Sequence, residues 1–120
     1  MRQYSGRVVK NTGDGVLATF DGPTRAIRCA VAVSDRATAD GLPIRAGLHT
    51  GEVELVGEDI AGIAVHLAKR VESAAAPGTV YVSRTVRDLI AGSSIELSDR
   101  GTHELKGIPG TWTLYEVEAL

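Results

Sequence analysis

The stretch Val8–Phe20, VVKNTGDGVLATF, places Gly-Asp-Gly between two apolar runs and carries a lysine four residues before the aspartate. Apolar runs around an Asp-Gly pair predict two antiparallel strands joined by a tight turn, because glycine tolerates the positive φ that such turns need. An exposed carboxylate in a glycine-flanked turn also suits a Mg²⁺ ion that holds phosphate oxygens. On this stretch alone, Lys10 and Asp14 are either turn residues or two parts of a nucleotide site.

The composition of the chain is that of an ordinary soluble domain. Its 120 residues are 43% hydrophobic and 23% charged, with a formal net charge of −2, so we expect a single domain over residues 1–120. This charge does not favour nucleic acid, and no apolar run is long enough for a transmembrane helix. Because the N-terminal segment lacks the apolar core of a signal peptide and Cys29 is the single cysteine, a cytoplasmic protein with Cys29 in its core is expected.

Hydrophobic periodicity and turn signals predict the order of helices and strands along the chain. This order is β-β-α-β-α-β-α-β-β, which predicts an α+β sandwich with helices packed on a mostly antiparallel sheet. The expected elements are strands at 7–11 and 16–20, a helix within 21–41 capped by Asp21 and closed by Gly41, one long β segment at 42–56, a helix at 60–78, a short central strand at 79–83, a helix at 84–92 capped by Ser83, and two strands within 95–120 around the Gly107–Gly110 turn.

The second predicted helix carries two polar groups on one face. His66 and Arg70 are four residues apart, so the imidazole and the guanidinium project together, while Leu67 and Val71 can face the core. Asp59 stands just ahead of this helix. Each of the three polar residues also has a plain structural explanation, as a helix-capping aspartate, a surface histidine and a solvated arginine.

Four segments, VVKNTGDGVLATF, IRAGLHTGEVEL, EDIAGIAVHLAKRVE and RGTHELKG, together resemble successive signatures of the class III adenylyl/guanylyl cyclase catalytic domain. The resemblance runs from about Gly6 to Val117. It implies a ferredoxin-like nucleotide cyclase fold of the bacterial adenylyl type, which converts ATP into 3′,5′-cyclic AMP and pyrophosphate. It also implies Mg²⁺ or Mn²⁺ as cofactor and a head-to-tail homodimer whose active sites draw residues from both chains.

The resemblance implies a role for individual residues. Asp14 resembles the second of the family's two metal-binding aspartates. Lys10 and Asp59 resemble the pair that binds the purine edge, because an ammonium facing N1 and a carboxylate accepting from the exocyclic amine fit adenine and not guanine. Arg70 resembles the arginine that stabilises charge on the phosphates as the ribose 3′-oxygen attacks the α-phosphorus. Lys106 resembles a lysine that approaches the triphosphate, although a solvated lysine at a strand end explains it equally well.

Two departures from the family pattern bear on activity. His66 stands where the family usually has an asparagine that orients the ribose. A neutral imidazole can still donate one hydrogen bond, so we expect a tolerated variant with a lower rate. The family's first metal aspartate lies on an opening strand, whereas residues 1–13 of this chain contain no Asp or Glu. The chain is therefore expected to be truncated at its N-terminus relative to the family and to bind at least one metal ion weakly.

Two other functions are open on the sequence. The first is a catalytically weak or inactive cyclase-homology module, which binds nucleotide or dimerises with an intact cyclase that supplies the first aspartate. The second is an unrelated α+β binding domain, which would require the four matched segments to be coincidence.

Overall fold

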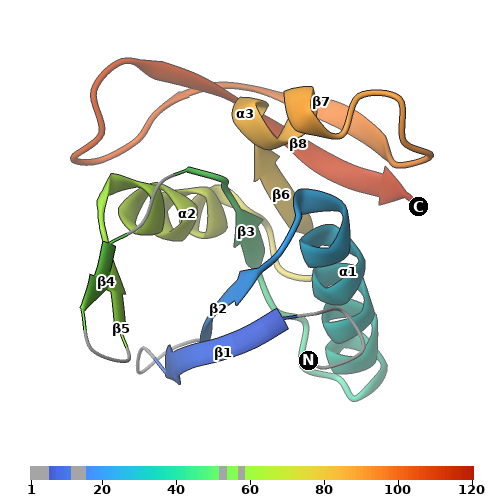
Figure 1. The fold of residues 1–120 in the computed structure, drawn as a ribbon. Coiled ribbons are helices and arrows are strands. Elements are labelled where there is room, and N and C mark those ends of the chain that lie inside the picture. The colour runs from blue at the N-terminus through green and yellow to red at the C-terminus, as the bar shows by residue number, and fades with distance from the viewer. Residues whose placement is uncertain (1–5, 12–15, 52–53, 57–58) are drawn as a thin grey trace.

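The computed structural model describes residues 6–11, 16–51, 54–56 and 59–120, with side chains described for residues 20–51 and 62–120. In this part of the chain, a four-stranded sheet, two separate two-stranded sheets and three helices form the fold (Figure 1). The α+β class predicted from the sequence is confirmed. None of the helices in the described ranges is long and apolar enough to cross a membrane.

The stretch around Gly-Asp-Gly contributes the first hairpin. Strand β1 (Gly6–Asn11) pairs antiparallel with β2 (Val16–Phe20), and the register shifts between Val8 and Lys10. The predicted pair of strands is confirmed. Asp14 itself lies outside the described residues.

Helix α1 (Pro23–Ala39) begins with a proline, whose fixed φ suits the first turn of a helix. Its N-cap is Gly22 and no side chain caps it, so the prediction that Asp21 caps this helix is wrong. A capping side chain must come from the residue directly before the first helical position, and Asp21 is one residue too early. The helix ends just before Gly41, whose φ of +80° is typical of a helix terminus. Cys29 is buried on this helix, as predicted.

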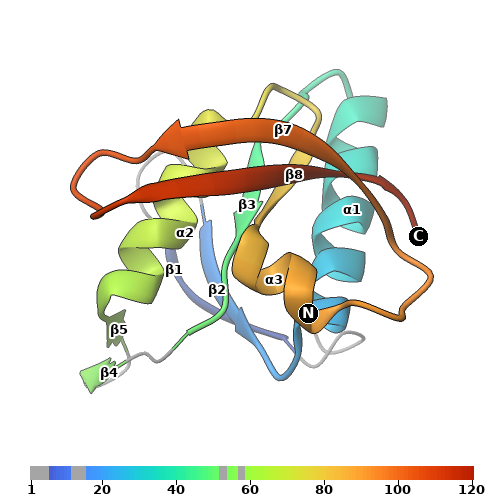
Figure 2. The same ribbon diagram turned by 90° about the horizontal axis from the view of Figure 1, so that it is seen from above.

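The four-stranded sheet has the order β3-β6-β8-β7. Strand β6 (Val80–Ser83) lies between β3 (Ala46–Leu48), to which it is parallel, and β8 (Thr111–Ala119), to which it is antiparallel. Strand β7 (Glu96–Glu104) pairs antiparallel with β8. Every residue of β6 is buried, which confirms the predicted short central strand. Strands β7 and β8 form a long ribbon that extends well beyond β3 and β6 (Figure 2).

Segment 42–56 is not the single long strand predicted from the sequence. Its first part contains β3, but its end forms β4 (Glu54–Val56), which belongs to a separate sheet with β5 (Asp59–Ala61). The pairing is local, because only two positions in the sequence separate β4 from its partner β5. Asp59 therefore lies in a strand, and the N-cap of the next helix is Gly62, so the helix-capping explanation of Asp59 is wrong.

Helix α2 (Ile63–Ala74) packs directly on β3. A Cβ atom at Gly47 would lie 2.5 Å from the Cα of Glu72 and 2.8 Å from the carbonyl carbon of Val71, and closer still to the backbone nitrogen of Glu72. Glycine at this strand position therefore permits the helix backbone to touch the sheet. This contact fixes the position of every side chain that α2 carries.

Helix α3 (Arg84–Leu89) follows β6 and is capped by Ser83, whose Oγ accepts a hydrogen bond from the backbone N–H of Val86 at 3.4 Å. This confirms the predicted cap. Two clusters of buried side chains hold the helices on the sheet. One contains Leu67, Val71, Ala75, Tyr81, Leu105, Ile108 and Leu114, and the other contains Ile27, Val82, Val86, Ile90 and Ile95.

Candidate functional site

One face of α2 carries the polar residues singled out in the sequence. Leu67 and Val71 of this helix are buried in the first cluster, whereas His66 and Arg70 are partly exposed. The Nε atom of Arg70 is buried and has no hydrogen-bond partner among the described residues. A buried N–H without an acceptor is costly, by about 1–3 kcal/mol. An acceptor for this N–H would therefore have to come from outside the described residues.

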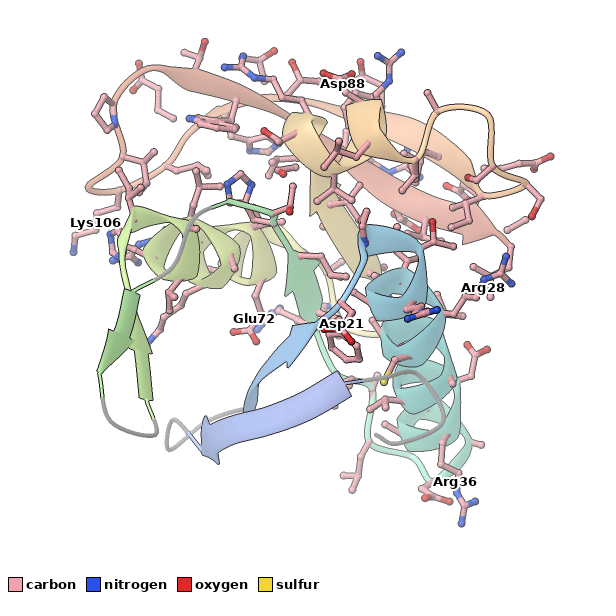
Figure 3. The ribbon with its side chains drawn as sticks, in the orientation of Figure 1. Asp21, Arg28, Arg36, Glu72, Asp88 and Lys106 are labelled. Carbon is pink, nitrogen blue, oxygen red and sulfur yellow. The ribbon has the colours of Figure 1, made fainter. Side chains whose placement is uncertain are left out.

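The connection between β7 and β8 lies over the same helix (Figures 1 and 2). Leu105 and Ile108 anchor it, because both are buried in the cluster that contains the core face of α2. Between these anchors, Lys106 is exposed and projects beside α2 (Figure 3). The next residue, Gly107, has a φ of +81°, and a Cβ atom there would lie 2.9 Å from Nε2 of His66. The fold thus brings the segment that carries Lys106 next to His66.

Two further predicted site residues lie on neighbouring strands. Lys10 is in β1, where its backbone is paired with Leu17, and Asp59 is the first residue of β5, paired with Val56. Strands β1 and β5 are in contact, and β5 also contacts α2. The side chains of Lys10 and Asp59 are not among the described side chains. The structure therefore shows that the two strands are in contact but does not describe where the ammonium and the carboxylate lie.

The predicted metal site falls outside the described part of the chain. Among the described residues, no group of three or more His, Cys, Asp or Glu side chains could hold a metal ion. The described side chains therefore do not make a metal centre by themselves, and Asp14, an oxygen donor of the kind that Mg²⁺ prefers, remains the candidate ligand from the sequence.

A cluster that the sequence did not indicate holds the segment after β3. Nδ1 of His49 and Oγ of Ser83 are 2.7 Å apart and share a hydrogen bond. The imidazole meets Trp112 edge to face, with ring centroids 5.6 Å apart, and the guanidinium of Arg84 lies 4.5 Å from the centroid of the Trp112 ring. Burial lowers the pKa of His49 below its ordinary value, so the imidazole is neutral at pH 7. An isolated histidine in the sequence gives no sign of such contacts, since the partners of His49 are Ser83 of β6 and Trp112 of β8.

Comparison with known proteins identifies the family to which the chain belongs. The sequence profile of the adenylate and guanylate cyclase catalytic domain matches residues 24–119. The chain belongs to this family. The profile covers α1, the four-stranded sheet and α2, and therefore includes His66, Arg70 and Lys106.

Individual members of the cyclase family resemble the chain over most of its length. A putative adenylate cyclase 3 from Rhizobium meliloti (strain 1021) is 35% identical in an alignment 114 residues long, which covers 88% of this chain and 19% of that protein. The crystal structure of an adenylate/guanylate cyclase/hydrolase from Silicibacter pomeroyi has a TM-score of 0.83 at 31% identity, covering 97% of this chain and 74% of the other. The catalytic core of a rhodopsin-guanylyl cyclase with converted specificity, in complex with ATPαS, has a TM-score of 0.84 at 26% identity, covering 98% and 74%.

The chain spans about a fifth of the length of two of its curated relatives, so the matched domain is a part of larger proteins there. What the chain shares with these relatives is a nucleotide cyclase catalytic domain, and its homologues include one of the adenylyl type.

Proposed function

We propose that the chain is an adenylyl cyclase domain that converts ATP into 3′,5′-cyclic AMP and pyrophosphate at the interface of a head-to-tail homodimer. The observation that carries this proposal is the contact between β1 and β5, because these strands carry Lys10 and Asp59. An ammonium group that donates to N1 of the base and a carboxylate that accepts from its exocyclic amine match adenine. Guanine presents a donor at N1 and an acceptor at the neighbouring carbon, so the same pair disfavours GTP.

The phosphate end of the site is assigned to α2 and to the β7–β8 connection. In the reaction, the ribose 3′-oxygen bonds to the α-phosphorus as the bond from that phosphorus to the pyrophosphate oxygen breaks, and the hydroxyl proton is released. Negative charge increases on the phosphate oxygens during this step. We assign the stabilisation of this charge to Arg70, and the lack of an acceptor for its buried Nε among the described residues supports the assignment. Lys106 would contact the triphosphate from the neighbouring segment.

A divalent ion, Mg²⁺ or Mn²⁺, would be held by Asp14 and would neutralise phosphate charge when bound. In the head-to-tail arrangement, Asp14 of one chain serves the site to which the other chain contributes Lys10, Asp59, His66 and Arg70. A single chain is then inactive, and each dimer has two composite sites.

Mixing two inactive variants tests this arrangement directly. Asp14→Ala and Arg70→Ala should each abolish cyclic AMP formation in the presence of Mn²⁺ and ATP, since each removes one half of both sites. In an equal mixture, half of the dimers combine the two variants, and one site in each of these is intact. We therefore expect recovery of about a quarter of the wild-type rate. Lys69→Ala, an exposed neighbour on α2, is the control that should retain full activity. A mixture that stays inactive would refute the composite site.

A second candidate function is a module that contributes half a site to an intact cyclase. One observation favours it: in the described part of the chain, the β1–β2 hairpin forms a sheet separate from the four-stranded one. This function predicts that the chain alone forms no cyclic AMP. Cyclic AMP should form when the chain is mixed with an intact cyclase domain in which the arginine equivalent to Arg70 has been replaced.

A further inference from the structure

The contact between His66 and Gly107 joins α2 to the segment that carries Lys106. His66 is partly buried, and its Nε2 occupies the space in which a side chain at position 107 would begin, 2.9 Å from the ideal Cβ position. Gly107 also has a φ of +81°, a conformation that other residues rarely adopt. Position 107 is therefore restricted to glycine for two independent reasons, which are the positive φ of its backbone and the imidazole that fills the space beside it.

The segment around Lys106 is held at both ends by buried side chains. Leu105 and Ile108 are 7% and 8% exposed and pack in the cluster that includes Leu67 and Val71 of α2. The N–H of Ile108 donates to the carbonyl of Leu105 at 2.9 Å, which closes a tight turn. Lys106 and Gly107 lie inside this turn, and the ring of His66 packs against it from the helix side.

We propose that His66 is a positioning residue, which holds the turn so that the ammonium of Lys106 and the guanidinium of Arg70 bind the same triphosphate. The proposal rests on the function proposed above and changes the role expected of His66. The resemblance to the family implies that this position orients the ribose. The geometry points instead to the polyphosphate, because Nε2 is directed at the backbone of the turn.

Two ligands separate these roles. Inorganic tripolyphosphate has no ribose, so a positioning role predicts that His66→Ala weakens its binding by the same factor as that of ATP, about fivefold in each case. A ribose contact predicts weaker binding of ATP and unchanged binding of tripolyphosphate, which would overturn the proposal. Isothermal titration calorimetry with Mn²⁺ measures both. His66→Gln, which restores a polar group of similar reach, should recover most of the affinity, and Lys69→Ala is the control for loss of a side chain on α2.

A double-mutant cycle tests whether His66 acts through Lys106. Lys106→Ala should weaken tripolyphosphate binding by about tenfold. If His66 serves to position Lys106, the double variant should bind no more weakly than Lys106→Ala alone. Factors that multiply, to a loss of about fiftyfold, would show independent roles and overturn the proposal.

If the wild-type chain binds neither ligand, the proposed function is refuted. Hydrogen exchange still tests the positioning role of His66 in that case, because it requires no ligand. The amide of Ile108 is protected by its bond to the carbonyl of Leu105. In His66→Ala this amide should exchange at least several-fold faster, while that of Val82 in the central strand is unchanged. Equal exchange rates of the Ile108 amide in the two proteins would overturn the positioning role.

Discussion

Replacement of Gly47 by alanine tests the close packing on which the position of α2 depends. The new Cβ would lie 2.5 Å from the Cα of Glu72 and 2.8 Å from the carbonyl carbon of Val71, and carbon atoms in proteins do not approach so closely. Because both neighbours are backbone atoms of a helix, no side-chain rotation relieves the clash. Helix α2 must move away from β3. Overpacking of this kind costs about 1–3 kcal/mol, and we expect a loss of about 3 kcal/mol in the free energy of unfolding.

Urea denaturation followed by far-UV circular dichroism gives this free energy, and the melting temperature should fall by roughly 10 °C. Gly22→Ala is a matched control, since a Cβ at Gly22 would meet nothing within 4 Å and its φ of −176° suits any residue. As Gly22 is the N-cap of α1, this control should cost below about 1 kcal/mol. If Gly47→Ala changes the free energy of unfolding by under about 0.5 kcal/mol, the contact between α2 and β3 does not restrain the helix and the reasoning fails.

Other consequences of the structure can be measured separately. Burial lowers the pKa of His49, so the unfolded chain takes up the proton first as the pH falls. The free energy of unfolding should therefore decrease below pH about 6.5. Urea titrations at pH 7.5 and 5.5 should show a smaller difference in this free energy between the two pH values for His49→Gln than for the wild-type chain. Ser83→Ala should cost about 1–3 kcal/mol in the same assay, because it removes the cap of α3 and the partner of His49; a loss below about 0.5 kcal/mol would contradict this. Lys10→Glu combined with Asp59→Cys should shift the product of any active form from cyclic AMP toward cyclic GMP, and an unchanged preference for ATP would refute the assignment of base recognition.

Local signals in the sequence predicted much of the fold. Alternating residues around Gly-Asp-Gly identified the first hairpin, and the apolar run that contains Val80–Ser83 identified the central strand, because both patterns depend on neighbours in the sequence. The predictions that failed concern exact positions and competing partners. Asp21 is one residue from the N-cap position, and segment 42–56 divides because its end pairs with the next few residues instead of extending β3.

The sequence indicated which residues belong to the candidate site, but it did not indicate most of the contacts between them. Spacing on a helix predicted that His66 and Arg70 share a face, and the helix is confirmed. The contact of His66 with Gly107 joins positions 41 residues apart in the sequence, and a glycine in a predicted turn gives no sign of which side chain fills the space beside it. The same holds for the cluster around His49, whose other members, Ser83, Trp112 and Arg84, come from separate elements. The roles of Lys10, Asp14 and Asp59 remain predictions.

The division of the strands among three sheets has a consequence for how such a domain can diversify. Strands β1 and β5 are outside the four-stranded sheet, whereas α2 is pressed against it at Gly47. Positions 10 and 59, to which base recognition is assigned by proposal, lie on strands outside the four-stranded sheet, so the proposed preference between purines could change in evolution without a change in that sheet. The helix that is assigned to the leaving group has no such freedom, since any shift would separate it from the strand beneath.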